Sequence, residues 1–163
     1  MSLELAVSDR VRHRRSWEGG TTMPHSTDVA EHILRRLGPT PALKLQKLVY
    51  YCQAWSLVWD ERPMVSDEFQ AWANGPVAPE LYDRHRGQFM VSTVDGDPKL
   101  LDGAALDTIE GVLKFYADKP SQWLSDLTHT EDPWREARGS LSPGARSNAV
   151  ISHAAMAEYY SGL

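Results

Sequence analysis

A run of mostly apolar residues over positions 44–59 (KLQKLVYYCQAWSLVW) dominates the hydrophobic pattern of the chain. At about 100° per residue, its polar residues Gln46, Gln53 and Ser56 fall on one narrow stripe with Asp60, and nearly every other position is apolar. A helix that is apolar around most of its circumference is packed on several sides at once. The pattern therefore predicts a long buried central helix, whose polar stripe needs either solvent or hydrogen-bond partners.

A shorter amphipathic helix is expected just before it. Val, Ala, Ile and Leu recur at helical spacing over residues 27–37, Thr27 is a suitable N-cap, and a Gly-Pro pair ends the pattern. Thr40 and Pro41 then provide the N-cap and the first residue of the central helix.

Beyond residue 60 the hydrophobic period changes from helical spacing to alternation. Residues 64–72 alternate like a short half-buried strand, which an Asn-Gly-Pro sequence breaks. Pro79 begins a helix of about two turns, and residues 89–94 follow as a second short strand. The two strands together predict a small antiparallel sheet.

The C-terminal third returns to helical spacing. Its predicted elements are helices over residues 103–117, from residue 121 and over residues 130–138, a loop over residues 139–148, a third strand over residues 149–151 and a last helix capped by Ser152. The predicted fold class is α+β and predominantly helical. A long buried central helix is surrounded by shorter helices and a small antiparallel sheet of two or three strands.

Length and composition indicate one domain after a short N-terminal extension. The chain has 163 residues, and a chain of this size buries roughly 70% of its unfolded surface in a single core. Residues 1–26 show no sustained apolar period and contain a Gly-Gly-Thr-Thr run, so we expect a disordered or irregular extension. Residues 27–163 form the predicted domain.

The charge of the chain is mildly acidic and unevenly distributed. The formal net charge is -5, and residues 1–22 hold four basic and three acidic residues, which leaves 13 basic and 19 acidic residues in the rest. An acidic body argues against nucleic-acid binding as the main activity, because such binding needs a basic face. Cys52 is the only cysteine, and no apolar run approaches the roughly 18 residues of a membrane span. These features favour a cytoplasmic protein.

Two features offer candidate chemistry, and each has a simpler structural interpretation. Cys52 with a histidine is a candidate nucleophile pair, but a thiol within so apolar a helix is typically a small core residue. His129, Glu131 and Asp132 form the densest cluster of histidine and carboxylates, yet no second histidine lies at metal-motif spacing. The sequence therefore predicts no catalytic set, no metal, no cofactor and no small-molecule substrate.

Three longer blocks follow one another along the chain. They are KLQKLVYYCQAW at residues 44–55, DEFQAWANGPVAPELYDRHR at residues 67–86 and LSDLTHTEDPW at residues 124–134. Together and in this order they resemble the SocA-like Panacea domain, and the resemblance covers residues 27–160. The family's common Tyr-Tyr-Ala tripeptide is replaced here by Tyr-Tyr-Cys, which ends at Cys52 and exchanges one small core residue for another.

The resemblance implies that the protein is an antitoxin. Panacea-domain proteins of bacteria and prophages are encoded beside unrelated toxins and neutralise them, usually by direct protein contact. The implied partner is a cognate protein toxin, such as an alarmone-synthetase-like enzyme or another toxic enzyme. Neither a membrane nor a nucleic acid is an expected partner.

The second of the three blocks contains the candidate contact with that partner. Aromatic residues on a rigid turn are typical of interface hot spots, and glycine and proline pre-order the backbone there. The candidate partner-binding residues are Trp72, Asn74, Gly75, Pro76, Val77, Pro79, Tyr82 and Asp83. For the two aromatic residues, simple closure of the core is the alternative interpretation.

Two other functional classes remain open from the sequence. A DNA-binding regulator would use Arg10, Arg12, Arg14 and Arg15 as a basic arm, and its DNA affinity would fall steeply with salt. A hydrolase would use Cys52 with a histidine, and alkylation of the native thiol would reveal it.

Overall fold

The structure, a computed structural model, describes residues 22–163 and has the predicted class, α+β and predominantly helical. In chain order its elements are α2 (Ser26–Leu37), β1 (Thr40–Pro41), α3 (Ala42–Trp59), β2 (Phe69–Trp72), β3 (Gly75–Val77), α4 (Pro79–His85), β4 (Met90–Val91), the 3-10 helix η1 (Pro98–Leu100), α5 (Gly103–Tyr116), α6 (Ser121–Thr130), α7 (Asp132–Arg138), β5 (Val150–Ile151) and α8 (His153–Ser161). Among these helices, none is long and apolar enough to cross a membrane.

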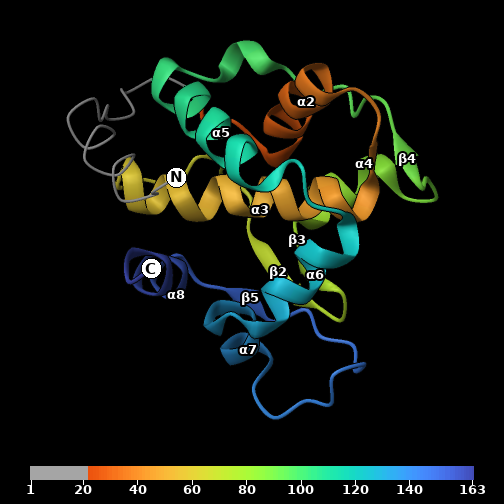
Figure 1. Cartoon of the computed structure of the whole chain (residues 1–163), viewed down its shortest axis with the longest axis vertical. Helices are drawn as coiled ribbons and strands as arrows, with labels where there is room; N and C mark the ends of the chain where they lie inside the picture. The colour runs from red at the N-terminus through yellow and green to blue at the C-terminus, as the bar shows by residue number, and fades with distance from the viewer. Residues whose placement is uncertain (1–21) are drawn as a thin grey trace.

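Helix α3 runs through the middle of the molecule, as the hydrophobic pattern predicted (Figure 1). Helices α2 and α5 cover one side of it, and α8 with the strands β2, β3 and β5 lies on the other. Leu45, Leu48, Cys52, Trp55 and Trp59 are all buried within one continuous core. A helix surrounded in this way has almost no solvent-facing side, which explains its nearly uniform apolar composition.

Aromatic rings and one carboxylate fill the core between α3, α5 and α8. Tyr51 stacks on Tyr116 with ring centroids 4.1 Å apart, and Glu131 accepts hydrogen bonds from the hydroxyls of Tyr51 at 2.8 Å and Tyr160 at 2.7 Å. Burial raises the pKa of Glu131 to about 7, although the two hydroxyl donors act in the opposite direction. This carboxylate therefore links α3 to α8.

The polar stripe of α3 is buried and hydrogen-bonded to neighbouring backbone and side chains. Gln53 accepts from the backbone N–H groups of Met64 at 2.8 Å and Val65 at 3.0 Å. Ser56 donates to a backbone carbonyl of the following turn at 2.8 Å, and Asp60 accepts from a threonine of α5 at 2.6 Å. Of the two alternatives left open by the sequence, hydrogen-bond partners are the correct one.

The strands form two separate small sheets, and one predicted pairing is wrong. β2 pairs antiparallel with both β3 and β5, so the predicted third strand is confirmed. β4 pairs antiparallel with β1, not with β2. Thr40 and Pro41 were expected to begin the central helix, but they are extended and form β1, so α3 starts at Ala42. The N–H of Ala42 donates to the carbonyl of Phe89 at 2.8 Å, which ties this small sheet to the start of α3.

The chain before α2 packs against the segment that leads into β2. Helix α2 begins at Ser26 with His25 as N-cap, so Thr27, the predicted cap, is buried one residue inside the first turn. The N–H of Ser26 donates to Oδ1 of Asp67 at 2.8 Å, and the carbonyl of Pro24 accepts from a backbone N–H of the same segment at 2.9 Å. A shift of one or two residues at a helix end is small, but here it brings the N-cap into long-range contacts.

Candidate functional site

The candidate contact residues lie on a β-hairpin and on the helix that follows it. β2 and β3 are joined by a two-residue turn, and Trp72 pairs with Gly75 at its base. The sequence interpretation treated Asn-Gly-Pro as a break, whereas Gly75–Val77 forms the second strand. Gly75 has a φ of +115°, a conformation that other residues rarely adopt, so glycine is what allows the strand to start so soon after the turn.

Helices α3 and α6 hold this hairpin from beneath. Nζ of Lys47 donates to the carbonyl of Pro76 at 2.9 Å, and Oγ of Ser125 donates to the carbonyl of Asn74 at 2.7 Å. A Cβ atom on Gly75 would lie 2.6 Å from Cε of Lys47. The hairpin backbone at Gly75 therefore approaches the Lys47 side chain of α3 so closely that only glycine fits there.

Lys47 is itself an unusual residue for this position. The side chain is fully buried, and burial lowers the pKa of its amine to about 7. A lysine in the first turns of a helix is normally a solvent-exposed residue, so no local pattern predicts that Lys47 supports the hairpin.

The junction between β3 and α4 is fixed by Gln46, another member of the polar stripe. Its side-chain amide accepts from the N–H of Ala78 at 2.9 Å and donates to the carbonyl of the same residue at 3.4 Å. Nε2 of Gln46 also lies 2.9 Å from Nε2 of His85, whose pKa is lowered by burial. Both ends of α4 are thus held by one side chain of the central helix.

Burial divides the eight candidate residues into two groups. Those buried beneath the hairpin surface are Gly75, Pro76 and Val77. Those with side chains that reach the surface are Trp72, Asn74, Pro79, Tyr82 and Asp83, and we call these five the contact face. Within it, the rings of Trp72 and Tyr82 meet edge to face with centroids 5.0 Å apart. Of the eight candidate residues, only the five of the contact face have side chains that reach the surface.

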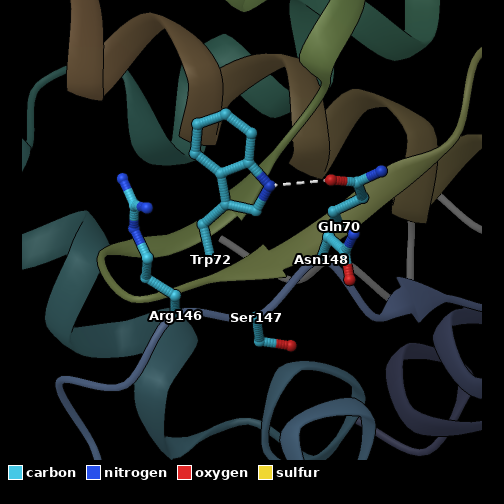
Figure 2. Close-up of a pocket in the computed structure, with 5 residues that line it drawn as sticks. All are labelled: Gln70, Trp72, Arg146, Ser147 and Asn148. Atoms are coloured by element: carbon cyan, nitrogen blue, oxygen red, sulfur yellow. Dashed lines mark hydrogen bonds between the residues drawn. The ribbon is translucent and has the colours of Figure 1, made fainter.

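A pocket of about 490 Å³ opens beside Trp72 (Figure 2). Gln70 and Trp72 form one wall, and Arg146, Ser147 and Asn148 form the other. Nε1 of Trp72 donates to Oε1 of Gln70 at 2.8 Å, which holds the indole upright over the hairpin. Sequence reasoning missed the second wall, because it identified residues 139–148 only as a loop.

Arg138 holds that loop against the hairpin. The side chain is buried, and its guanidinium donates to the carbonyl of Ala71 in β2 at 3.0 Å. It also donates to the carbonyls of Ser142 at 2.9 Å, Pro143 at 3.2 Å and Ala145 at 2.7 Å. An arginine near a helix end is usually solvent-exposed, so no local signal predicts that it organises the loop.

The other candidate residues do not assemble into a reactive site. Cys52 is fully buried, and burial raises the pKa of its thiol, which disfavours the thiolate that a hydrolase would need. The ring of His129 stacks on Trp134 with centroids 4.2 Å apart, while Glu131 turns into the aromatic core and Asp132 stays exposed. These three residues therefore do not gather around a common point.

The basic arm of the DNA-binding alternative lies outside the described residues. Arg10, Arg12, Arg14 and Arg15 all fall within residues 1–21.

Comparison with known proteins identifies the family of the chain. The sequence model described as "Antitoxin SocA-like, Panacea domain" matches residues 45–135, more than half of the chain, and this span includes the hairpin and all of α4. A search of curated proteins and a search of solved structures found no match. The expected resemblance is thereby confirmed, and the chain belongs to the family of SocA-like antitoxins that contain the Panacea domain.

Proposed function

We propose that this protein is a cytoplasmic antitoxin that neutralises a protein toxin by binding it directly. The observation that carries this proposal is the family match over residues 45–135, which supports an antitoxin role. The burial of Cys52 agrees with a function in binding, since a thiol in the core cannot reach a substrate outside it. The partner would be a toxic enzyme, for which an alarmone-synthetase-like protein is one candidate class.

The contact face is our candidate for the toxin-binding surface. Lys47 and Gln46 fix the backbone beneath it through bonds to Pro76 and Ala78, so little conformational entropy would be lost on binding. Its half-buried aromatic residues, Trp72 and Tyr82, are of the types that dominate interface energies. The pocket beside Trp72 could receive one side chain of the partner.

The charge of the molecule suggests what kind of surface the toxin presents. Residues 23–163 contain 13 basic and 19 acidic residues, a net charge of -6. Complementary charge speeds association and disfavours wrong partners. A toxin with a basic substrate-binding surface is therefore the preferred partner of this acidic domain.

Co-expression with the product of the adjacent gene tests the proposal. That product should arrest growth when expressed alone, and this protein should restore growth. Asn74→Arg and Asp83→Arg alter exposed residues of the contact face, so both should weaken protection while the melting temperature stays within a few degrees.

The matched control is Glu136→Arg, an equally exposed acidic residue on α7 outside the contact face. It changes the net charge as Asp83→Arg does, and it should leave protection intact. Equal loss of protection in Glu136→Arg would show that net charge alone matters. Full protection by both contact-face variants would place the toxin-binding surface elsewhere on the domain.

A further inference from the structure

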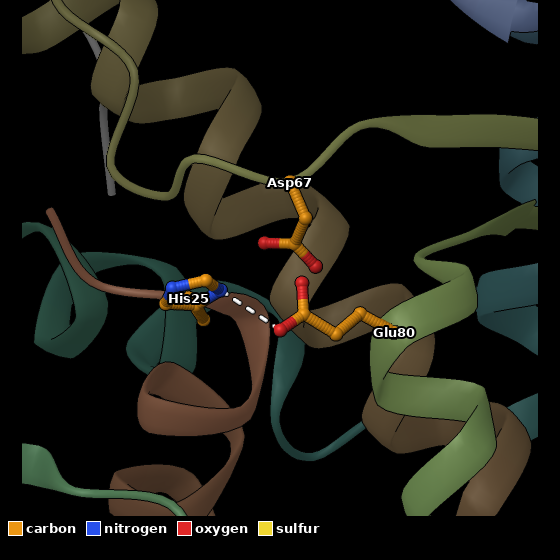
Figure 3. Close-up of side chains that lie close together, drawn as sticks. All are labelled: His25, Asp67 and Glu80. Atoms are coloured by element: carbon orange, nitrogen blue, oxygen red, sulfur yellow. Dashed lines mark ion pairs between the residues drawn. The ribbon is translucent and has the colours of Figure 1, made fainter.

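Three side chains that are distant in sequence converge beside the start of α2 (Figure 3). His25 is the N-cap of α2, Asp67 precedes β2, and Glu80 lies in the first turn of α4. One nitrogen of His25 and one oxygen from each carboxylate all lie within 4.8 Å of one another. Within residues 22–163 no other trio of His, Cys, Asp or Glu side chains meets this condition.

Neighbouring groups orient the Asp67 carboxylate and the His25 imidazole. Both oxygens of Asp67 accept hydrogen bonds from Ser26, one from its N–H and one from its hydroxyl, so the carboxylate has a fixed orientation. Nδ1 of His25 lies 2.8 Å from Oε1 of Glu80, an ion-pair distance without the directional geometry of a hydrogen bond. The imidazole and the two carboxylates thus face one shared space.

Among the residues that the structure describes, negative charge exceeds positive charge in this cluster. Two carboxylates face a single imidazole, and within the described part of the chain neither carboxylate has a lysine or arginine as an ion-pair partner. A bound cation would offset this excess negative charge.

We propose that His25, Asp67 and Glu80 bind one divalent transition-metal ion, with Zn²⁺ as the best match to the ligands. One imidazole nitrogen and two carboxylate oxygens are donor types that Zn²⁺ accepts, and three protein ligands leave a position for water. The side chains of His25 and Glu80 are 44% and 43% exposed, so the cluster lies at the surface of the domain.

The ion would join three separate parts of the fold. It would fix the start of α2, the segment before β2 and the first turn of α4 relative to one another. Since α4 also carries Pro79, Tyr82 and Asp83, the ion would stiffen the contact face. Metal binding itself does not depend on the proposed antitoxin function.

Calorimetric titration of the chelator-treated full chain with Zn²⁺ at pH 7.5 tests the site. About one equivalent should bind, and the same ion should raise the melting temperature because it binds the native state. Glu80→Gln removes an exposed ligand with little risk to folding, and it should weaken Zn²⁺ binding by at least about 100-fold. His25→Ala should have a similar effect, and acidification below the pKa of His25 should release the ion.

Two matched variants serve as controls. His32→Ala removes a histidine of the same helix, and Glu136→Gln removes an exposed carboxylate elsewhere, so both should bind Zn²⁺ like the unchanged protein. The proposal is overturned if the unchanged protein shows neither binding heat nor a shift in melting temperature. It is equally overturned if Glu80→Gln and His25→Ala bind Zn²⁺ as tightly as the two controls.

Discussion

Lys47 is a buried amine whose Nζ donates a hydrogen bond to the Pro76 carbonyl. In apolar surroundings a charged amine is disfavoured, which is why its pKa falls to about 7. The residue positions the hairpin, and it does so at a cost in stability that depends on pH.

The first prediction is that Lys47 makes the free energy of unfolding rise with pH. An unfolded lysine binds its proton up to about pH 10.5, whereas the folded Lys47 releases it near pH 7. Between these values the unfolded state binds more protons, so the free energy of unfolding should increase by about 1.4 kcal/mol per pH unit from this group. Denaturant unfolding of the unchanged protein and Lys47→Met, compared at pH 7, 8 and 9, measures the difference.

Lys47→Met keeps an unbranched chain but cannot titrate, so the difference in unfolding free energy between the two proteins should change over this range. A difference that stays constant from pH 7 to pH 9 would mean that Lys47 remains charged in the folded protein.

A second prediction concerns Gly75, where both the backbone conformation and the lack of space disfavour a side chain. Its φ of +115° disfavours any side chain, and a Cβ would lie 2.6 Å from Lys47 and 2.8 Å from Oγ1 of Thr128. Gly75→Ala should therefore lower the free energy of unfolding by roughly 2 kcal/mol or more. Gly87→Ala is the control, because Gly87 has a φ of +83° with nothing within 4 Å of the added atom, and it should lose only about 1 kcal/mol. Equal losses in the two variants would contradict the close approach.

At the scale of elements, helical periods were predictable and strand pairing was not. The apolar pattern of α3, and the N-cap Ser152 of α8, whose hydroxyl accepts from a backbone N–H at 3.0 Å, are local signals. The pairing of β4 with β1 depends instead on where two short, weakly patterned segments meet in space. Strands of two residues contain too few side chains for alternation to specify a partner.

The same limit applies to the candidate site. The sequence singled out the segment around Trp72 because of its aromatic and turn residues. It could not show that Val77 is buried or that Arg146 would line a pocket beside the indole, since both follow from long-range packing. Lys47 and Arg138, which support the site, have side chains that sequence reasoning normally assigns to solvent.

The third prediction tests the orientation of α3. Trp55 is buried, its ring stacks on Trp59 at 5.1 Å, and its Nε1 donates to the hydroxyl of Tyr116 at 3.1 Å. Trp55→Ala should lower the free energy of unfolding by roughly 3–5 kcal/mol through lost burial and a residual cavity. Trp123→Ala, at a residue 42% exposed on α6, should lose less than about 1 kcal/mol. Chemical denaturation distinguishes them, and a similarly small loss for Trp55→Ala would show that α3 is turned differently.

The fourth prediction concerns the start of the domain. Removal of residues 1–22 keeps the contacts of Pro24, His25 and Ser26, so the melting temperature should change by only a few degrees. Removal of residues 1–26 deletes them and leaves Asp67 without its Ser26 donors, which should lower the free energy of unfolding by about 2–3 kcal/mol. Thermal and denaturant unfolding of the two truncated chains gives the comparison. A large loss in the longer truncated chain would assign a stabilising role to residues 1–22.

At the scale of the whole molecule, the domain is built around one helix that serves two purposes. Its apolar surface forms the core, and its polar residues fix the backbone of the hairpin and α4. The contact face is therefore presented by a pre-ordered segment on an acidic domain. That combination suits recognition of a partner, and in our proposal the partner is a toxin.

Titration of toxin activity against this protein is the most direct test of that account. Purified product of the adjacent gene is held at a concentration well above the dissociation constant, and its activity is measured as this protein is added. Direct neutralisation predicts a linear fall in activity that ends at a fixed molar ratio of the two proteins, with a complex of the same ratio on gel filtration. Complete inactivation of excess toxin by a small fraction of an equivalent would contradict the account, because it would show that this protein acts on the toxin as a catalyst.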